Sequence, residues 1–237
     1  MAVPELSRLA ATIIACRLCP RLVRYRERVA REKKREFAGW TYWGRPVPGL
    51  GDPDAEVLIV GLAPAAHGAN RTGRMFTGDG SGQWLIRSLH RAGFASQPVS
   101  EHRDDGLRLH GAFITATVRC APPDNAPLPS EMAHCARYLR RELDLLPGIR
   151  VVVALGHVAY RQIIALAAER GFEIPRPRPR FAHGTLFALR SETGRRMQII
   201  ASYHPSRQNT QTGRLTEPML DAIFTTARRA LRTSPGG

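Results

Sequence analysis

Residues 57–85 read VLIVGLAPAAHGANRTGRMFTGDGSGQWL, and the fold prediction starts from this stretch. Its first six residues, 57–62, form a short apolar run rich in β-branched side chains, which predicts a buried strand. The glycines that follow give the loop backbone freedom, and Ser81 can cap a helix that carries Trp84. A strand, a glycine-rich loop and a helix N-terminus together form a cradle for an anion or a ligand.

Glycine content alone leaves a second interpretation of this loop open, namely a long flexible connection. The glycine spacing matches neither GxGxxG nor GxxxxGK[ST], so the nucleotide-binding fingerprints do not apply. Because the chain lacks a phosphate-loop lysine motif, a nucleotide-dependent transferase is also disfavoured.

The alternation of strand, turn and helix continues along the chain. Further strands are predicted at 113–118 and 151–155 and in a hairpin formed by 185–190 and 197–202, with helices at 4–15, 22–37, 130–146, 157–170 and 216–231. This order predicts an α/β fold, a three-layer α/β/α sandwich with a central, mostly parallel, four-stranded sheet. Ligands of such sheets bind outside the carboxyl ends of the strands, so the loops 63–79, 120–125, 156–157 and 204–216 should converge there.

Length and composition bound the class of protein. The 237 residues, 43% of them hydrophobic, fit a single domain over 1–237, with a helical N-terminal segment at 1–50 and a disordered tail at 233–237. The sequence shows neither a signal peptide nor an apolar run of membrane-spanning length, so we expect a cytoplasmic monomer without membrane contact.

The charge balance points to a polyanionic partner. Lysine and arginine number 35 against 20 acidic residues, a formal net charge of +15. Nucleic acid is the simplest partner for such a protein, and a cytoplasmic DNA-binding protein would be associated with the nucleoid. The alternative is a generally basic surface without a specific partner.

The chain has four cysteines, Cys16, Cys19, Cys120 and Cys135. A CxxC pair can be redox-active, metal-binding or simply buried, and no strand precedes it as a thioredoxin-like motif requires. The wide spacing of the second pair argues against zinc. Four thiolates with no spare cysteine suit a [4Fe–4S] cluster, with ordinary buried thiols as the alternative.

Three stretches resemble family 5, the type b enzymes, of the uracil-DNA glycosylase superfamily. They are GLAPAAHGANRTGRMFTGDGSG at 61–82, VRCAPPDN at 118–125 and ASYHPSRQNTQTGRLT at 201–216. The resemblance implies a DNA repair enzyme that flips uracil, and other deaminated bases, out of DNA and hydrolyses the N-glycosidic bond, leaving an abasic site. It also implies a [4Fe–4S] cluster on the four cysteines.

The resemblance assigns roles to individual residues. Phe76 would stack on the base, Asn125 would read its edge, and His204 would face O2 of the leaving uracil as an electrophile. Backbone groups of Gly61 and Ala63 would line the base pocket. Without the resemblance, loop packing, a turn and a core histidine are the alternative explanations for the three side chains.

Asp79 is the carboxylate of the glycine-rich motif, and more than one role is open to it. The better-known family of the superfamily has an acidic residue where this chain has the sequence APA at 63–65, as type b enzymes do. Asp79 is the nearest carboxylate in the motif, and it can orient water, stabilise the sugar cation or cap the following helix.

The stretch 206–215 is predicted to contact DNA. Arg207 and Arg214 suit phosphate groups, and Leu215 could act as a wedge in the gap left by the flipped base. For Leu215, a place as the first core residue of the last helix is favoured over the wedge. A non-catalytic iron–sulfur protein that binds nucleic acid is the alternative function.

Overall fold

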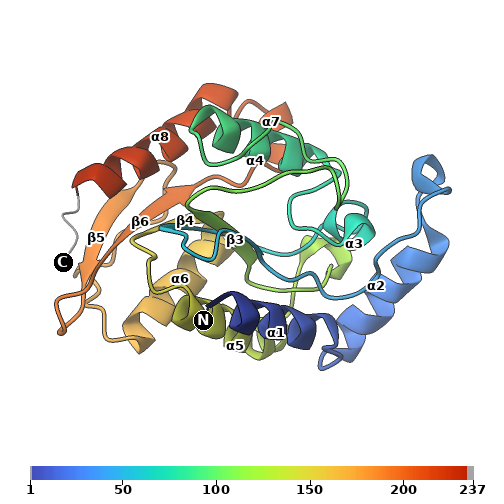
Figure 1. Ribbon diagram of the computed structural model, residues 1–237, viewed down its shortest axis with the longest axis horizontal. Coiled ribbons are helices and arrows are strands. Elements are labelled where there is room, and N and C mark those ends of the chain that lie inside the picture. Colours follow the sequence, from blue (N-terminus) through green and yellow to red (C-terminus); the bar gives the residue numbers. More distant parts are fainter. Residues whose placement is uncertain (1, 234–237) are drawn as a thin grey trace.

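The computed structural model describes residues 2–233 as a sheet covered by helices on both faces (Figure 1). The predicted α/β/α sandwich is therefore confirmed. Most of the predicted disordered tail, residues 234–237, lies outside the described residues, whereas Thr233 ends the last helix.

The sheet has six strands in the order β1-β3-β2-β4-β6-β5. The strands are β1 (Leu50–Gly51), β2 (Val57–Gly61), β3 (Ala112–Ala116), β4 (Val151–Leu155), β5 (Leu186–Arg190) and β6 (Arg196–Ser202). The four central strands β3, β2, β4 and β6 are parallel, and β1 and β5 pair antiparallel at the edges. The prediction of four strands was wrong because the two edge strands extend the parallel set; β1 is only two residues long and gives no periodic signal.

Helices form a layer on each face of the sheet (Figure 1). On one face, α4 (Gly80–Arg91) packs with α8 (Glu217–Thr233). On the other face lie α5 (Pro129–Leu145) and α6 (His157–Glu169), with α1 (Ala2–Ile14) packed against α5. The remaining helices are α2 (Pro20–Glu32) and four short ones, η1 (Arg35–Phe37), α3 (Ala69–Thr72), η2 (Pro123–Asn125) and α7 (Arg207–Gln211).

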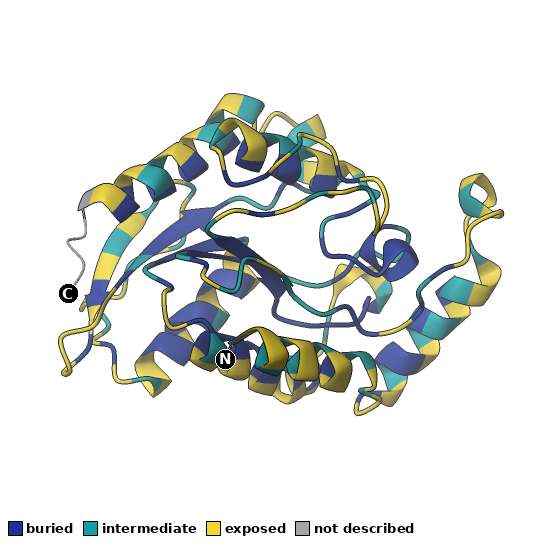
Figure 2. Cartoon of the chain, viewed as in Figure 1, coloured by how far each residue is buried: buried dark blue, intermediate teal, exposed yellow. Residues whose placement is uncertain are grey.

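The hydrophobic core lies between the central strands and the helices on each face of the sheet. Every residue of β2, β3 and β4 is buried, as expected for strands covered on both faces (Figure 2). The short helix α3 in the glycine-rich loop is buried along its whole length. The loop is therefore a packed part of the core, and the prediction of a flexible connection does not apply to it.

Two helix boundaries differ from the prediction. The helix predicted at 22–37 ends at Glu32, because Lys33 adopts a left-handed φ of 57° that stops the helix before η1. The N-cap of α4 is Asp79 rather than Ser81, and the Asp79 carboxylate accepts a hydrogen bond of 2.8 Å from the Gly82 N–H.

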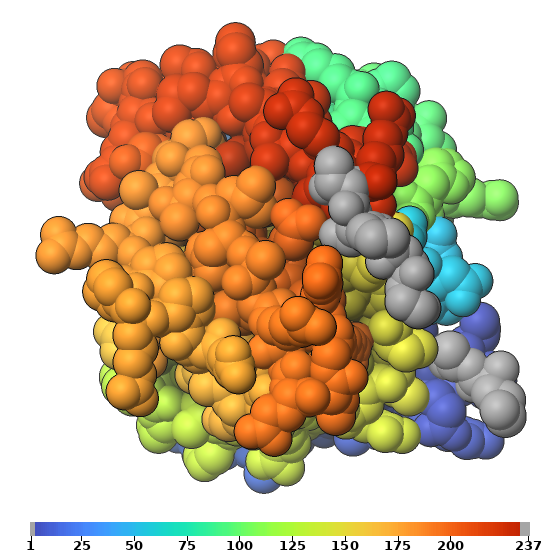
Figure 3. Space-filling model, turned by 90° about the vertical axis from the view of Figure 1, so that its left-hand side faces the viewer, coloured from blue at the N-terminus to red at the C-terminus, as the bar shows by residue number. Residues whose placement is uncertain are grey.

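The parallel strands direct their carboxyl ends toward α3 and the end of α2 in Figure 1. The opposite end of the molecule is shown in Figure 3, where the β5–β6 hairpin and α8 make up much of the surface. No helix among residues 2–233 is long and apolar enough to cross a membrane.

Leu89 tests how far the packing of α4 stabilises the fold. Its side chain is fully buried between α4 and the sheet, whereas that of Val99 is 48% exposed. We expect Leu89→Ala to lower the free energy of unfolding by about 2–5 kcal/mol, because it removes buried methyl groups and leaves a cavity. The control Val99→Ala should change it by less than about 0.5 kcal/mol in the same urea titration. Equal effects of the two substitutions would contradict the described packing.

Candidate functional site at the carboxyl edge of the sheet

The ends of the parallel strands bring the motif loops together. Gly61 at the end of β2 pairs with Ala116 of β3, and Leu155 of β4 pairs with Ser202 of β6. The loops that follow these residues carry the motifs at 61–82, 118–125 and 201–216. The convergence predicted from the strand order is therefore confirmed.

The ring of Phe76 lies directly on the end of β2. A Cβ atom added at Gly61 would lie 2.9 Å from the Phe76 Cζ, so only glycine admits the ring there. A Cβ atom added at Gly82 would lie 2.3 Å from the Phe76 carbonyl oxygen. Phe76 itself has a φ of 49°, uncommon for an aromatic residue. Two of the glycines that marked this loop in the sequence thus serve to place one aromatic ring.

His204 lies beside that ring. The centroids of the Phe76 and His204 rings are 5.8 Å apart and their planes make an angle of 32°. His204 is only partly exposed, and desolvation by the surrounding protein lowers its pKa to about 4. At neutral pH the ring is therefore uncharged, with one N–H donor and one acceptor nitrogen.

Two residues for which sequence reasoning gave no role hold His204 in place. The Asn209 side chain in α7 donates a hydrogen bond of 2.8 Å to the His204 carbonyl oxygen. The Tyr203 N–H donates a hydrogen bond of 3.1 Å to His183 Nδ1, and the two rings are 5.2 Å apart. Only the folded chain shows that His183 fixes the backbone next to His204.

The two carboxylate oxygens of Asp79 have different surroundings. One carboxylate oxygen caps α4, while the other lies over Gly68, where an added Cβ atom would be 1.9 Å from Asp79 Oδ2. Burial raises the pKa of Asp79, opposed by the N–H groups of Gly82 and Ser81 and by the Arg71 guanidinium. The capping role that the sequence left open is therefore real, and one oxygen remains for a second role.

Asn125 and Ala63 do not lie against the rings of Phe76 and His204. Asn125 is exposed at the end of η2 with a φ of 55°, and no hydrogen bond within residues 2–233 joins its side chain to Phe76 or His204. Ala63 packs against the apolar cluster that contains the four cysteines. The structure thus brings Phe76 and His204 together, but it shows no direct contact between them and Asn125.

The predicted DNA-contact residues divide into two groups. Arg207 and Arg214 are exposed, and the Arg214 guanidinium lies 4.6 Å from the centroid of the Tyr203 ring. Leu215 is fully buried in the core, and its N–H bonds the Asn209 carbonyl oxygen. The wedge assigned to Leu215 is therefore corrected to the core residue that was its alternative, because a side chain packed against α4 and α8 is not available to DNA.

All four cysteines gather in one apolar cluster. Cys16 and Cys19 flank the turn between α1 and α2, Cys120 follows β3, and Cys135 lies in α5. Burial raises the pKa of Cys19 to about 11 and that of Cys120 to about 12. Within residues 2–233, no three His, Cys, Asp or Glu side chains stand close enough to share a single metal ion.

Two buried arginines line the same cysteine pocket. Arg26 Nη1 donates to Cys120 Sγ at 3.0 Å, but Arg26 Nε has no hydrogen-bond partner among the described atoms. Arg119 is paired with Glu142 at 2.6 Å, yet its Nε and Nη1 have no such partner either. Buried cations with unsatisfied donors are costly and call for a neighbouring anion. A cluster held by four thiolates would carry negative charge, so the four cysteines and the two buried arginines would suit such a group.

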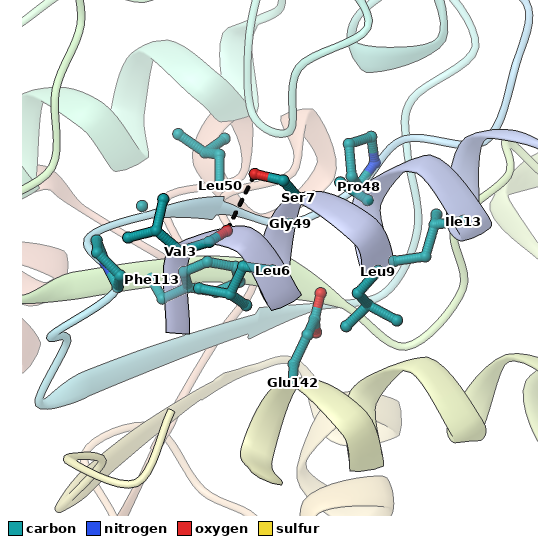
Figure 4. Close-up of a pocket in the computed structure, with 13 residues that line it drawn as sticks. Val3, Leu6, Ser7, Leu9, Ile13, Pro48, Gly49, Leu50, Phe113 and Glu142 are labelled. Carbon is teal, nitrogen blue, oxygen red and sulfur yellow. Dashed lines mark hydrogen bonds between the residues drawn. The ribbon is translucent and has the colours of Figure 1, made fainter. Parts of the chain in front are cut away.

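A separate cavity of about 240 Å³ lies between α1 and β1 (Figure 4). Its lining is mainly aliphatic, including Leu6, Leu9 and Leu50. Glu142 points into the cavity from α5, but its carboxylate already accepts from Arg119 and Thr115. None of the residues that line this cavity belongs to the motifs at 61–82, 118–125 and 201–216, so it is a packing gap rather than the functional site.

The lowered pKa of His204 predicts a pH-dependent stability. Between pH 6.5 and 4 the unfolded chain binds a proton at His204 that the folded chain does not, so stability falls as the pH drops through this window. We expect the loss to approach roughly 2–3 kcal/mol and to be absent in His204→Gln. Unfolding free energies of both proteins at pH 7 and pH 4.5 check this, because other acidic groups contribute equally to both. Parallel pH profiles would refute the buried, neutral imidazole.

Comparison with known proteins agrees with the geometry of the site. Residues 48–228 match the family described as the uracil DNA glycosylase superfamily. A protein named type-5 uracil-DNA glycosylase from Thermus thermophilus is 53% identical over 218 residues, 92% of this chain and 94% of that protein. One of the same name from Pyrobaculum aerophilum is 43% identical over 212 residues, 90% of this chain and 87% of that protein.

A more distant relative, named type-4 uracil-DNA glycosylase, comes from Archaeoglobus fulgidus. It is 30% identical over 161 residues, 68% of this chain and 70% of that protein. The family match spans all six strands and every loop at the carboxyl edge of the sheet. The chain therefore belongs to the uracil-DNA glycosylase superfamily, within its type-5 family.

Proposed function

We propose that this protein is a DNA repair glycosylase that flips uracil, and other deaminated bases, out of DNA and hydrolyses the N-glycosidic bond. The observation that carries the proposal is that the rings of His204 and Phe76 lie side by side at the carboxyl edge of the sheet, with centroids 5.8 Å apart. The names of the type-5 relatives support the choice of uracil in DNA as substrate.

The reaction breaks the bond between deoxyribose C1′ and uracil N1. The electron pair of that bond leaves with the base, and water adds its oxygen to C1′ and loses a proton. The products are uracil, protonated on release, and an abasic site. Catalysis therefore needs a platform for the extruded base, a donor for its developing negative charge and a group that directs water.

Phe76 and His204 meet the first two needs. The Phe76 ring is fixed against the end of β2, so it offers a preformed face for stacking. His204 is neutral at physiological pH and therefore donates an N–H hydrogen bond to uracil O2 rather than transferring a proton outright. Asn125, exposed on the neighbouring loop, would read the base edge with an amide that donates and accepts.

Asp79 is the candidate for the third need. The oxygen that caps α4 fixes the carboxylate, and the second oxygen can accept a hydrogen bond from a water molecule that approaches C1′. A raised pKa is consistent with a buried carboxylate that takes up the proton released by that water.

The activity is tested with purified protein and a uracil-containing duplex, in the presence of chelator and without nucleotide. We expect alkali-labile sites at uracil, with single-turnover rates that do not break near pH 6.5 because His204 stays neutral there. His204→Ala should lower the rate about 10²- to 10³-fold, since it removes a preorganised donor. A wild-type rate in this variant would show that another group carries the charge of the leaving base.

Two substitutions at Asp79 separate its roles in the same assay. Asp79→Asn keeps a side-chain oxygen that can cap α4, whereas Asp79→Ala removes both the cap and the carboxylate. If Asp79 directs water, both variants lose about 10²- to 10⁴-fold in rate. If Asp79 only caps the helix, Asp79→Asn retains the wild-type rate and Asp79→Ala loses only a few-fold.

We also propose that Cys16, Cys19, Cys120 and Cys135 hold a [4Fe–4S] cluster. When bound, the cluster would cross-link the four thiolates. The cysteines come from the α1–α2 turn, the loop after β3 and α5, so their ligation would fasten the N-terminal helices to the body of the domain. Arg26 and Arg119 would balance its negative charge with the donors that are otherwise unsatisfied.

Iron content tests this assignment. Cys120→Ser should lose iron and acid-labile sulfide and lower the melting temperature, because the N-terminal helices lose their anchor. Met132→Leu is the matched control, since Met132 packs against the same group of apolar side chains as the cysteines but carries no thiol. This variant should keep its iron and sulfide and the wild-type melting temperature. Wild-type protein that is fully active with zinc, or with no metal at all, would rule the cluster out.

A further inference from the structure

The segment 33–43, here called the Trp40 loop, projects from the end of α2 at the right of Figure 1. Trp40 is 37% exposed, and it is the only aromatic residue among the large apolar residues exposed on the part of the chain that the structure describes. Figure 2 shows the loop as largely exposed next to the buried α3. Tryptophan is highly buried on average, so this side chain is a candidate contact residue where its neighbours point to a ligand.

Arg71 of α3 fastens the Trp40 loop to the candidate active site. The Arg71 guanidinium lies 3.9 Å from the centroid of the Phe37 ring and 4.1 Å from that of the Trp40 ring. The same side chain, 3% exposed, donates to the His67 carbonyl at 2.8 Å and to the Gly78 carbonyl at 2.7 Å. Trp40 is therefore held at a fixed place relative to the residue that precedes Asp79.

Further bonds make this attachment rigid. The Trp43 N–H donates to the Arg71 carbonyl at 2.9 Å, and the Tyr42 hydroxyl lies 3.0 Å from His67 Nδ1. Gly73 adopts a φ of 77° and leaves room for the Trp43 ring, which a Cβ atom there would approach to 2.8 Å. The Trp40 loop is thus fastened to the glycine-rich loop that carries Phe76 and Asp79.

The charge around Trp40 is positive. Lys34 is paired with Glu36 at 2.9 Å, and Lys33 bonds the Ala38 carbonyl, while the exposed Arg35 side chain makes no ion pair within residues 2–233. Two more cations lie on the neighbouring Trp43 ring, with guanidinium carbons 5.7 Å and 4.7 Å from its centroid, those of Arg45 and Arg103. Cations around an exposed aromatic ring are the pattern of a nucleic-acid strand site.

We propose that the Trp40 loop is a second DNA-contact element, in which Trp40 stacks on a base or sugar of the strand next to the flipped nucleotide. Lys34 and Arg35 contact the phosphates of that strand. The proposal rests on the proposed function, since it takes uracil-containing DNA as the occupant. It also places an aromatic ring at the DNA surface, where Leu215, buried in the core, cannot serve.

Affinity and rate are measured separately to test this contact. The dissociation constant is measured on a duplex whose 2′-fluorinated deoxyuridine resists cleavage, and the single-turnover rate on the ordinary uracil duplex at saturating enzyme. We expect Trp40→Ala to weaken binding about 5- to 150-fold, the range for one stacked base, with a rate within about twofold of wild type. Trp40→Phe should recover much of the affinity, because it keeps a stacking face.

The matched control for Trp40 is Leu186→Ala, since Leu186 is 45% exposed on the β5 edge strand. Its affinity should equal that of wild type. Trp40→Ala with wild-type affinity overturns the proposal. If the same variant also excises uracil more slowly, Trp40 acts only by holding the Arg71 side chain in place.

The charges are tested through the salt dependence of binding. The double variant Lys34→Gln/Arg35→Gln should reduce the slope of log affinity against log salt by about 2, because two phosphate contacts are lost. Arg190→Gln/Arg196→Gln removes the same charge from paired positions on β5 and β6 and should leave the slope unchanged. Equal slopes in both double variants overturn the phosphate contacts.

The outcome also separates this proposal from the proposed function. Wild-type protein that binds the duplex but produces no abasic sites would refute the glycosylase activity, while the affinities of the loop variants would still report on the Trp40 surface. Wild-type excision together with unchanged affinity of Trp40→Ala would refute the Trp40 contact alone.

Discussion

The close contact between the Phe76 ring and the backbone of Gly61 is the constraint on which the site depends. An aromatic ring can lie on the end of a strand only where the strand has no side chain, so β2 must end in glycine. The loop must then turn back through a left-handed φ at Phe76, which is uncommon for an aromatic residue. The buried α3 and the hydrogen bonds of Arg74 with Thr77 and Asp105 hold it in that conformation.

This arrangement explains which parts of the structure could be predicted from the sequence. The strand-and-helix order gave the sandwich and the convergence of the loops, because apolar periodicity and strand direction are local properties. The two-residue β1 was missed because so short a strand has no periodicity, and the end of α2 was missed because a positive φ at Lys33 leaves no compositional signal. Ser81 was preferred as the cap of α4 although Asp79 stands two residues earlier.

The functional residues divide in the same way. Phe76 and His204 were assigned through the resemblance to the type b enzymes, and the structure brings their rings together. His183 and Asn209 could not be assigned, because each acts on the backbone next to His204 through a contact that exists only in the folded chain. The role of Arg71 likewise depends on rings thirty residues away in sequence. The [4Fe–4S] cluster stays a prediction, supported by the buried arginines beside the cysteines.

The helices α1 and α2 have their partners far along the chain. Each has thirteen residues, and they pack against Cys120, Cys135 and α5, about a hundred residues later. Isolated helices of this length are marginal in water. During synthesis, both helices therefore leave the ribosome before the segments that cover them, and their apolar faces stay exposed until residue 138 or beyond has emerged. Their docking is a late step of folding, and until then a protease or a chaperone has access to both helices.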